Sequence, residues 1–290
     1  MTSAYRTRFA PSPTGYLHVG HAYAARQAFD AADRAGGECL LRLEDIDQTR
    51  CRPAYETALL EDLHWLGLSW PEPVRRQSDH FEDFQQVIEA LRARGLVYRC
   101  FLTRKALQAE LDRRDIGISP AGERPYPGPE KLLSVDEVEA RLADGEGFAW
   151  RLSLARCRDL LGQAFDQLTF EETGDAPDIE TGLVKAHPDW LGDVLLARKD
   201  TPVSYHLAVC HDDAIQKISH IVRGADLYFA THIHVLLQAI MRWPTPIYQH
   251  HKLLLDEHGR KFSKTDRSKT LRSLREEGVR PDEILEGFPI

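Results

Sequence analysis

The chain has 290 residues and a formal net charge of −8 at pH 7, with 42% hydrophobic and 28% charged residues, as in an ordinary globular protein. Its first residues lack the apolar stretch of a signal peptide, and no apolar run approaches bilayer length, so we expect a cytoplasmic protein that does not contact membranes. The five cysteines are scattered and odd in number, which argues against a disulfide framework.

Predicted strands and helices alternate along the first hundred residues. The run from Arg8 to His21 begins as a short strand, breaks over two prolines and a glycine, and restarts as a helix near His18. Four further elements follow from apolar spacing: a buried strand at Cys39–Leu43, helices at 53–67 and 81–95, and a strand at Leu96–Tyr98. This alternation predicts an α/β architecture.

Between about Cys100 and Trp190 glycine and proline become more frequent, and short strands such as Phe148–Leu152 are predicted. Beyond this stretch we expect strands at 193–198, 205–209 and 218–223, and a helix at 226–242. The chain is therefore divided into a discontinuous nucleotide-binding domain (1–99 and 190–243), an insertion (100–189) and a C-terminal segment (244–290).

The segment around His18 has the features of a nucleotide site. A strand, a turn and a helix in succession point backbone N–H groups and the positive end of the helix dipole at the turn. His18 and His21 lie three residues apart and share one side of the helix, and Gly20 between them lets a flat ring approach the backbone. The alternative is a proline-rich turn followed by a helix with two surface histidines.

Lys261-Phe262-Ser263-Lys264-Thr265 is a second candidate for phosphate binding. Two lysines on a loop after Gly259 could close over phosphates and neutralise developing charge, although a solvated basic loop would look the same. Residues 260–280 contain eight basic and three acidic residues. That excess could contact an RNA backbone, or it could be a solvated helix face.

Taken together, His18–His21 and Lys261–Thr265 resemble the paired HIGH and KMSKS motifs of class I aminoacyl-tRNA synthetases. Arg8–Gly15 and Arg42–Asp47 are similar to the glutamyl branch of that family. The resemblance covers most of the chain. It implies a ligase with a Rossmann-like (HUP-type) parallel-sheet catalytic domain, an α/β insertion and a short C-terminal helical segment that contacts an RNA stem.

A glutamate site should offer two cations, one anion and fixed donors, because glutamate carries two carboxylates and one ammonium. Arg8 and Arg223 are the candidate carboxylate clamps, and Glu44 could hold the ammonium. By resemblance, the glutamate-binding positions are Arg8, Phe9, Ala10, Pro11, Ser12, Glu44, Tyr205 and Arg223. An ordinary surface pair of Arg8 with Glu44 is the alternative, and which arginine takes which carboxylate stays open.

The resemblance also implies the chemistry. Glutamate would attack the α-phosphate of ATP, and the resulting glutamyl-adenylate would acylate RNA; positioning and charge stabilisation suffice for this. The implied catalytic residues are His18, His21 and Lys264, and the implied ATP-binding residues are Pro11, His18, Gly20, His21, Lys261 and Lys264. Mg²⁺ would accompany ATP, held mostly by phosphates and water.

The acceptor is inferred from the stretch after Thr265, where about 25 residues are too few for the anticodon-reading domain of full-length glutamyl enzymes. By resemblance this favours the subfamily that attaches glutamate to the modified base queuosine in tRNA(Asp). The anticodon stem-loop would then be the RNA partner of an enzyme expected to be a monomer. The alternatives are a truncated enzyme charging the 3′ end of tRNA(Glu), and an inactive RNA-binding module.

Two departures from the family pattern stand out. Family members commonly bind zinc through a Cys-x-Cys pair and a Tyr-x-x-x-Cys element, whereas this chain has Cys100, Leu102, Tyr126 and Glu130 at those positions. Because zinc prefers sulfur- and nitrogen-rich ligands, we expect no zinc. Thr231–His234 also replaces a Thr-Pro-Arg-Gln element, which leaves contacts to nucleotide or RNA in that region open.

Overall fold

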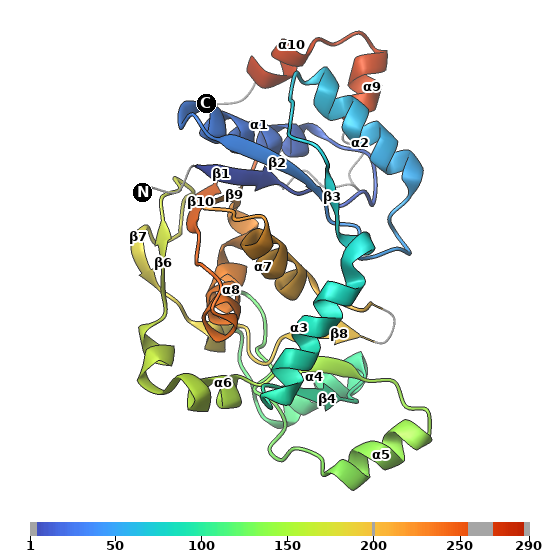
Figure 1. The fold of residues 1–290 in the computed structure, drawn as a ribbon, viewed down its shortest axis with the longest axis vertical. Helices are drawn as coiled ribbons and strands as arrows, with labels where there is room; N and C mark the ends of the chain where they lie inside the picture. Colours follow the sequence, from blue (N-terminus) through green and yellow to red (C-terminus); the bar gives the residue numbers. More distant parts are fainter. Residues whose placement is uncertain (1–4, 199–200, 255–268, 287–290) are drawn as a thin grey trace.

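The computed structural model describes residues 5–198, 201–254 and 269–286. Parallel strands form its centre (Figure 1). One sheet has the order β1 (Arg6–Phe9), β2 (Glu38–Leu43), β3 (Arg75–Arg76), and the other has the order β7 (Gly182–Lys185), β6 (Thr169–Glu172), β10 (Ile247–His251), β9 (His220–Gly224). The two sheets adjoin at β1 and β9, where the Ser219 N–H donates to the Arg6 carbonyl at 2.9 Å. All of these pairings are parallel except β6 with β7, so the predicted parallel-sheet domain is confirmed.

Helices cover both faces of these strands (Figure 1). On one face lie α1 (Val19–Arg34), α2 (Pro53–Trp65), α9 (Leu271–Glu276) and α10 (Pro281–Glu286), and on the other α7 (Tyr205–Ile215) and α8 (Tyr228–Met241). Each face has its own apolar core. The first joins α1 and α2 to β1 and β2. On the other face one cluster joins α8 to β6, β7, β9 and β10, and another joins α7 and α8 to α3 (Phe81–Ala93).

Helix α1 starts where the histidine motif predicts. Its interior is rich in alanine, the strongest helix former, and the small side chains of Ala22, Ala25 and Ala28 let it pack closely on the sheet. His18 is its N-cap residue, so the predicted strand, turn and helix are all present. The helix therefore places its first turn at the carboxyl end of β1.

A smaller antiparallel sheet forms the lower half of Figure 1. Its strands are β4 (Val97–Cys100), β5 (Ala149–Leu152) and β8 (Leu195–Arg198), and α4 (Arg104–Arg113), α5 (Val135–Ala143) and α6 (Leu154–Leu161) lie around it. Strand pairing crosses the predicted boundaries of the insertion, because β5 pairs with β4 and β8, and β6 pairs with β10 of the predicted C-terminal segment. The boundaries themselves stay a prediction.

The predicted strand at 205–209 is wrong, since these residues begin helix α7. Seven consecutive residues of this helix, Leu207 to Asp213, are buried. Its part from Leu207 to Cys210 is a short apolar run, which hydrophobic spacing alone cannot distinguish from a buried strand. The other predicted elements are present, with ends shifted by a few residues.

The C-terminal segment packs against the start of α1. Leu271 donates its N–H to the carbonyl of Leu17 at 2.8 Å, and Thr270 forms an antiparallel bridge with His18. Lys261 and Lys264 lie outside the described residues. The described cations between residues 260 and 280 are paired with carboxylates: Lys269 with Glu277, Arg272 with Glu276, Arg275 with Glu61, and Arg280 with Glu283.

Within the described ranges, no helix is both long and apolar enough to cross a bilayer.

Candidate active site

The candidate site lies at the carboxyl ends of β1, β2 and β9. The strands β2 and β3 lie on one side of β1, whereas β9 and β10 lie on its other side. Such a switch point in strand order opens a crevice where ligands bind in parallel α/β folds. Arg8 on β1, Glu44 just after β2 and Arg223 on β9 converge there, as predicted.

His18 and His21 form a capping box at the start of α1. The Gly20 N–H donates to His18 Nδ1, and the His18 N–H donates to His21 Nδ1, each at 3.1 Å. Since both Nδ1 atoms accept hydrogen bonds, each neutral ring carries its proton on Nε2. The ring centroids are 3.8 Å apart. The two imidazoles thus stand together at the positive end of a helix, which suits a phosphate.

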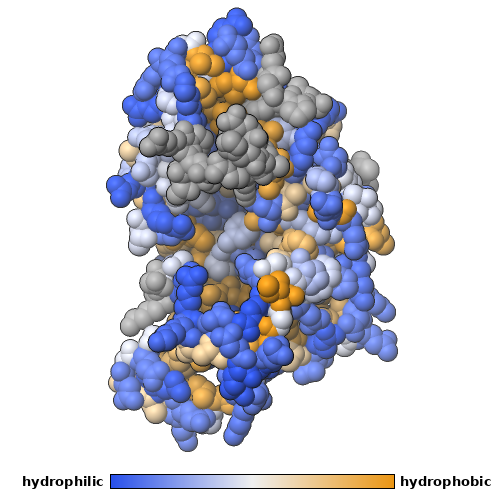
Figure 2. All heavy atoms as spheres, turned by 180° about the vertical axis from the view of Figure 1, so that it is seen from behind, coloured by the Kyte–Doolittle hydropathy of each residue, from blue (hydrophilic) through white to orange (hydrophobic). Residues whose placement is uncertain are grey.

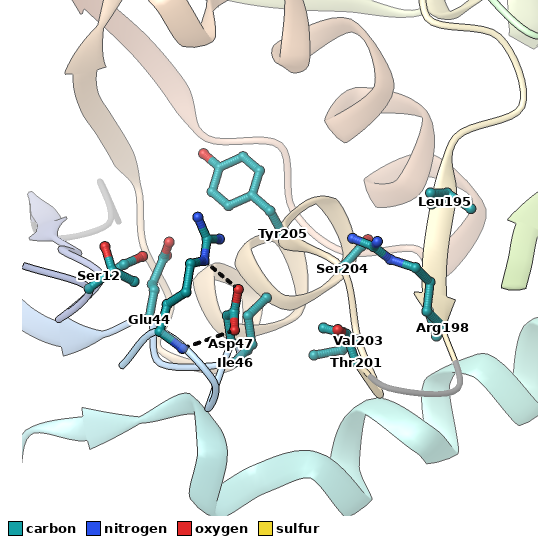
Figure 3. A pocket seen from close by; sticks show the side chains of 13 residues that line it. Ser12, Glu44, Ile46, Asp47, Leu195, Arg198, Thr201, Val203, Ser204 and Tyr205 are labelled. Atoms are coloured by element: carbon teal, nitrogen blue, oxygen red, sulfur yellow. Dashed lines mark hydrogen bonds and ion pairs between the residues drawn. The ribbon is translucent and has the colours of Figure 1, made fainter. Parts of the chain in front are cut away.

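A cavity of about 320 Å³ opens beside this crevice (Figure 3). Ser12 and Glu44 lie on one side of it, Tyr205 of α7 lies above, and Arg198 comes from β8 on the opposite side. At the rim of the cavity, Asp47 accepts a hydrogen bond from Arg50 Nε at 2.6 Å. In Figure 2, which shows the face opposite to that of Figure 1, the molecule is hollowed near mid-height. The lining of the cavity comes from the loops after β1 and β2, from β8 and from the start of α7, so the cavity lies between the parallel strands and the antiparallel sheet.

The loop after β1 is tied to the end of β2. The Glu44 N–H donates to the Pro11 carbonyl at 3.1 Å, and the Arg52 N–H donates to the Pro13 carbonyl at 3.2 Å. Among the predicted glutamate-binding positions, Ser12, Glu44 and Tyr205 line the cavity, whereas Arg8 and Arg223 lie behind them. Phe9 is buried in the core beneath the loop. The predicted residues are brought together, but in two layers.

Arg8 belongs to a buried ion cluster. Its members are three arginines, Arg8, Arg42 and Arg75, and three carboxylates, Glu44, Asp212 and Asp213. Asp213 of α7 accepts from Arg8 Nε at 2.9 Å and from Arg42 Nη1 at 2.8 Å. Arg42, which is fully buried, also donates to Glu44 at 3.0 Å. One carboxylate from a helix thus joins two neighbouring strands.

The alternative of a surface pair between Arg8 and Glu44 is wrong, because both side chains are buried and each is paired with another partner. Burial raises the pKa of Glu44, although Arg42 and Arg8 act in the opposite direction. For Asp213, burial also favours the neutral acid, but Arg8 and Arg42 outweigh it and lower its pKa. The cluster therefore keeps Asp213 ionised.

Sequence reasoning missed Arg42, Asp212 and Asp213. A signal was present, because each is a charged residue inside an apolar run, and charges are seldom fully buried unless they are paired. His250 and Glu172 were also missed. Their Nδ1···Oε2 distance is 2.5 Å, and both side chains are fully buried, but they are 78 residues apart and no local pattern links them.

The region of the expected zinc pattern has a different arrangement. Cys100, Tyr126 and Glu130 line one hollow, but Glu130 accepts from Arg113 at 2.9 Å, and the Tyr126 ring lies 5.0 Å from the Arg151 guanidinium carbon. A single sulfur and a carboxylate engaged by an arginine do not fit zinc. Within the described ranges, no group of three or more His, Cys, Asp or Glu is arranged to hold a metal ion. The expectation of no zinc stays a prediction.

Buried histidines near the site predict that acid destabilises the protein. Burial lowers the pKa of His206, His232 and His250 to about 4. The unfolded chain then binds more protons than the folded one between pH 6.5 and 4, so stability falls as pH falls through this window. Asp62, whose pKa burial raises to about 6, acts in the opposite direction, but the histidines outnumber it.

Thermal unfolding followed by circular dichroism should therefore show a lower Tm at pH 5 than at pH 7. The His232→Gln variant should lose less stability over the same change. A Tm that stays level or rises on acidification would contradict the burial of neutral imidazoles.

Comparisons with known proteins identify the family of this chain. The model of the family described as "tRNA synthetases class I (E and Q), catalytic domain" matches residues 4–289. The chain is 41% identical to the Glutamyl-Q tRNA(Asp) synthetase of Rhodobacter capsulatus, with 96% of this chain and 97% of that protein covered. It is 34% identical to the glutamate–tRNA ligase of Coprothermobacter proteolyticus, with 97% of this chain covered but only 56% of that protein.

Among solved structures, a glutamate tRNA ligase from Elizabethkingia meningosepticum in complex with its amino acid matches with a TM-score of 0.73 and 26% identity. The match covers 98% of this chain and 60% of that one. The chain therefore belongs to the class I tRNA synthetases of the glutamate and glutamine type, which are ligases with ATP as a substrate. Within that family it belongs with the glutamyl-Q tRNA(Asp) synthetases, since it matches almost the whole length of such a relative.

Proposed function

We propose that this protein activates L-glutamate with ATP and transfers the glutamyl group to the queuosine base in the anticodon of tRNA(Asp). The observation that carries the activation step is the convergence of the two capping histidines, Arg8, Glu44 and Arg223 at one crevice. The acceptor is proposed from the relatives named glutamyl-Q tRNA(Asp) synthetase.

For the nucleotide, the capping box supports a role for His18 and His21. With their Nδ1 atoms accepting backbone N–H groups, the Nε2–H groups are the donors that phosphate oxygens would meet. The N-terminus of α1 adds a favourable dipole for the triphosphate. Pro11 and Gly20 would border the nucleotide, and Mg²⁺ would arrive with it on phosphate oxygens.

Lys261 and Lys264 are proposed to bind the ATP phosphates from the side opposite to His18 and His21. Thr270 is paired with His18, and Lys264 precedes Thr270 by six positions along the chain. A fully extended chain spans at most about 3.6 Å per residue, so six positions reach roughly 22 Å at most. The long lysine side chain can cover part of this distance to the phosphates.

For glutamate, we propose that Arg8 and Arg223 take the two carboxylates and Glu44 the ammonium. Asp213 accepts from Nε and Nη2 of Arg8. In the part of the chain that the structure describes, Arg8 Nη1 has no hydrogen-bond partner, so it can serve a substrate carboxylate. Ser12 and Tyr205 supply hydroxyl groups at the cavity wall.

Two assays test the proposal. Glutamate-dependent ATP–pyrophosphate exchange should occur without any RNA, because activation needs only the crevice. Labelled glutamate should then pass to tRNA(Asp) from cells that make queuosine, and not to tRNA(Asp) from cells that lack it. Transfer should survive removal of the 3′-terminal adenosine. The absence of exchange would favour an RNA-binding module, and labelling of tRNA(Glu) would favour charging of its 3′ end.

The cytoplasmic location and the monomeric state expected from the sequence are retained as proposals. So is the role of tRNA(Asp) as the RNA partner.

A further inference from the structure

Arg223 differs from the other buried arginines of the site in its electrostatic surroundings. The three arginines of the buried ion cluster face three carboxylates. Arg223 is only 6% exposed, yet none of the described carboxylates lies within ion-pair distance of it. A buried cation without a direct counter-ion is costly, and a substrate carboxylate would offset that cost.

The five N–H groups of Arg223 are nevertheless engaged. Nε donates to His250 Nε2 at 3.0 Å, and Nη2 donates to Thr231 Oγ1 at 2.7 Å and to the Leu227 carbonyl at 3.2 Å. Nη1 meets the Tyr205 hydroxyl at 3.2 Å and His234 Nδ1 at 3.4 Å. Tyr205 lines the cavity, so a substrate carboxylate that takes the place of its hydroxyl would meet the Nη1 edge, while the opposite edge stays held by the protein.

The hydrogen bond from Arg223 determines the tautomer of His250. Arginine can only donate, so His250 Nε2 must accept, and the ring proton lies on Nδ1. That Nδ1–H donates to Glu172 Oε2, while Glu172 Oε1 accepts from the backbone N–H groups of His250, at 2.9 Å, and Gly174, at 2.8 Å. Burial alone would raise the pKa of Glu172. These hydrogen bonds outweigh the burial and lower the pKa, so the carboxylate is ionised. The result is a hydrogen-bonded chain of the Arg223 cation, the neutral His250 imidazole and the Glu172 anion, which we call the relay.

We propose that Glu172 and His250 are positioning residues that orient the Arg223 guanidinium so that its Nη1 edge binds a carboxylate of the substrate glutamate. This inference rests on the proposed function. Glu172 fixes the His250 tautomer, and His250 fixes the plane of the guanidinium together with Thr231. Glu172 lies on β6, a strand that precedes the predicted second half of the catalytic domain.

The Glu172→Gln variant tests the relay, because it changes one atom and leaves the volume almost unchanged. To satisfy both backbone donors, the glutamine must turn its oxygen toward them and its NH₂ toward His250 Nδ1. His250 Nδ1 must then accept, which places an Nε2–H against the Nε–H of Arg223. We expect the KM for glutamate in pyrophosphate exchange to rise roughly 10- to 100-fold, the loss of a hydrogen bond to a charged group, with little change in the KM for ATP.

Nitrogen-15 NMR of the imidazole groups provides a readout that a merely structural role would not move. The His250 proton should reside on Nδ1 in the unchanged protein and on Nε2 in the variant. A matched control is Asp193→Asn, which alters a carboxylate just before β8 that is also buried and accepts from the Tyr98 hydroxyl and the Leu154 N–H. Its KM for glutamate should remain that of the unchanged protein.

The outcomes separate the two proposals. If the unchanged protein shows no glutamate-dependent exchange, the proposed function fails. If it does exchange, and Glu172→Gln keeps the same KM for glutamate or the same His250 tautomer, the relay is wrong. A rise in KM that Asp193→Asn matches would also overturn it, because the effect would then come from general loosening of the fold.

Discussion

Replacing Asp213 with alanine is expected to destabilise the protein by about 3–5 kcal/mol, a large share of the stability of a typical domain. Asp213 is the shared carboxylate of Arg8 and Arg42, whose side chains are both buried. Removing it leaves two desolvated cations with one anion fewer, and the β1–β2 strand pair loses its link to α7. Urea unfolding followed by fluorescence measures the loss.

A surface carboxylate provides the comparison for this measurement. Asp166 pairs with Arg158 at 2.7 Å, but the Asp166 side chain is 65% exposed and that of Arg158 40%, so Asp166→Ala should cost less than about 1 kcal/mol. If Asp213→Ala were no more destabilising than Asp166→Ala, the buried ion cluster would not contribute to stability as described.

The second large effect concerns the histidines at the start of α1. We expect His18→Asn to reduce kcat for pyrophosphate exchange by about 10²- to 10³-fold, because it removes a donor that would stabilise charge on the phosphates. Asparagine is among the best N-cap residues, so the cap on the Gly20 N–H should be retained and stability should change little. Steady-state exchange kinetics and thermal unfolding of the same preparation check both parts.

The same reasoning gives a matched variant at the other histidine. His21 is the third helical residue, where glutamine can accept from the backbone of the N-cap residue, so His21→Gln also preserves the capping box. By contrast, His18→Ala should lose about 1 kcal/mol of stability as well as activity. If His18→Asn retained kcat within threefold of the unchanged protein, the proposed phosphate contact would be wrong.

Local patterns were sufficient to predict most of the framework. The start of α1 was predicted from a short strand and a turn with two prolines and a glycine, all within a few positions of His18. The strand at β2 and the helices α2 and α3 follow from apolar spacing in the same way. Helix α7 could not be predicted from spacing because it is buried on all sides, and that depends on packing by distant segments.

In the candidate site, too, the residues of a local pattern could be predicted and their distant partners could not. Arg8, Glu44, Tyr205 and Arg223 were predicted from the resemblance to a family pattern; the structure brings them to one crevice, and their roles stay a prediction. The partners that hold them, such as Asp213 and His250, are more than 25 residues away along the chain from the arginines they contact. No periodicity reports such contacts.

Strand β6 has a consequence for any attempt to shorten this protein. It lies between β7 and β10, so that the outermost strand of the sheet is β7 and the backbone of β10 is covered on both sides. Excising residues 100–189 would remove both β6 and β7 and leave β10 as a bare edge, with unpaired N–H and C=O groups open to another chain. The shortened chain would be prone to self-association through strand addition, so the insertion also protects the protein against aggregation.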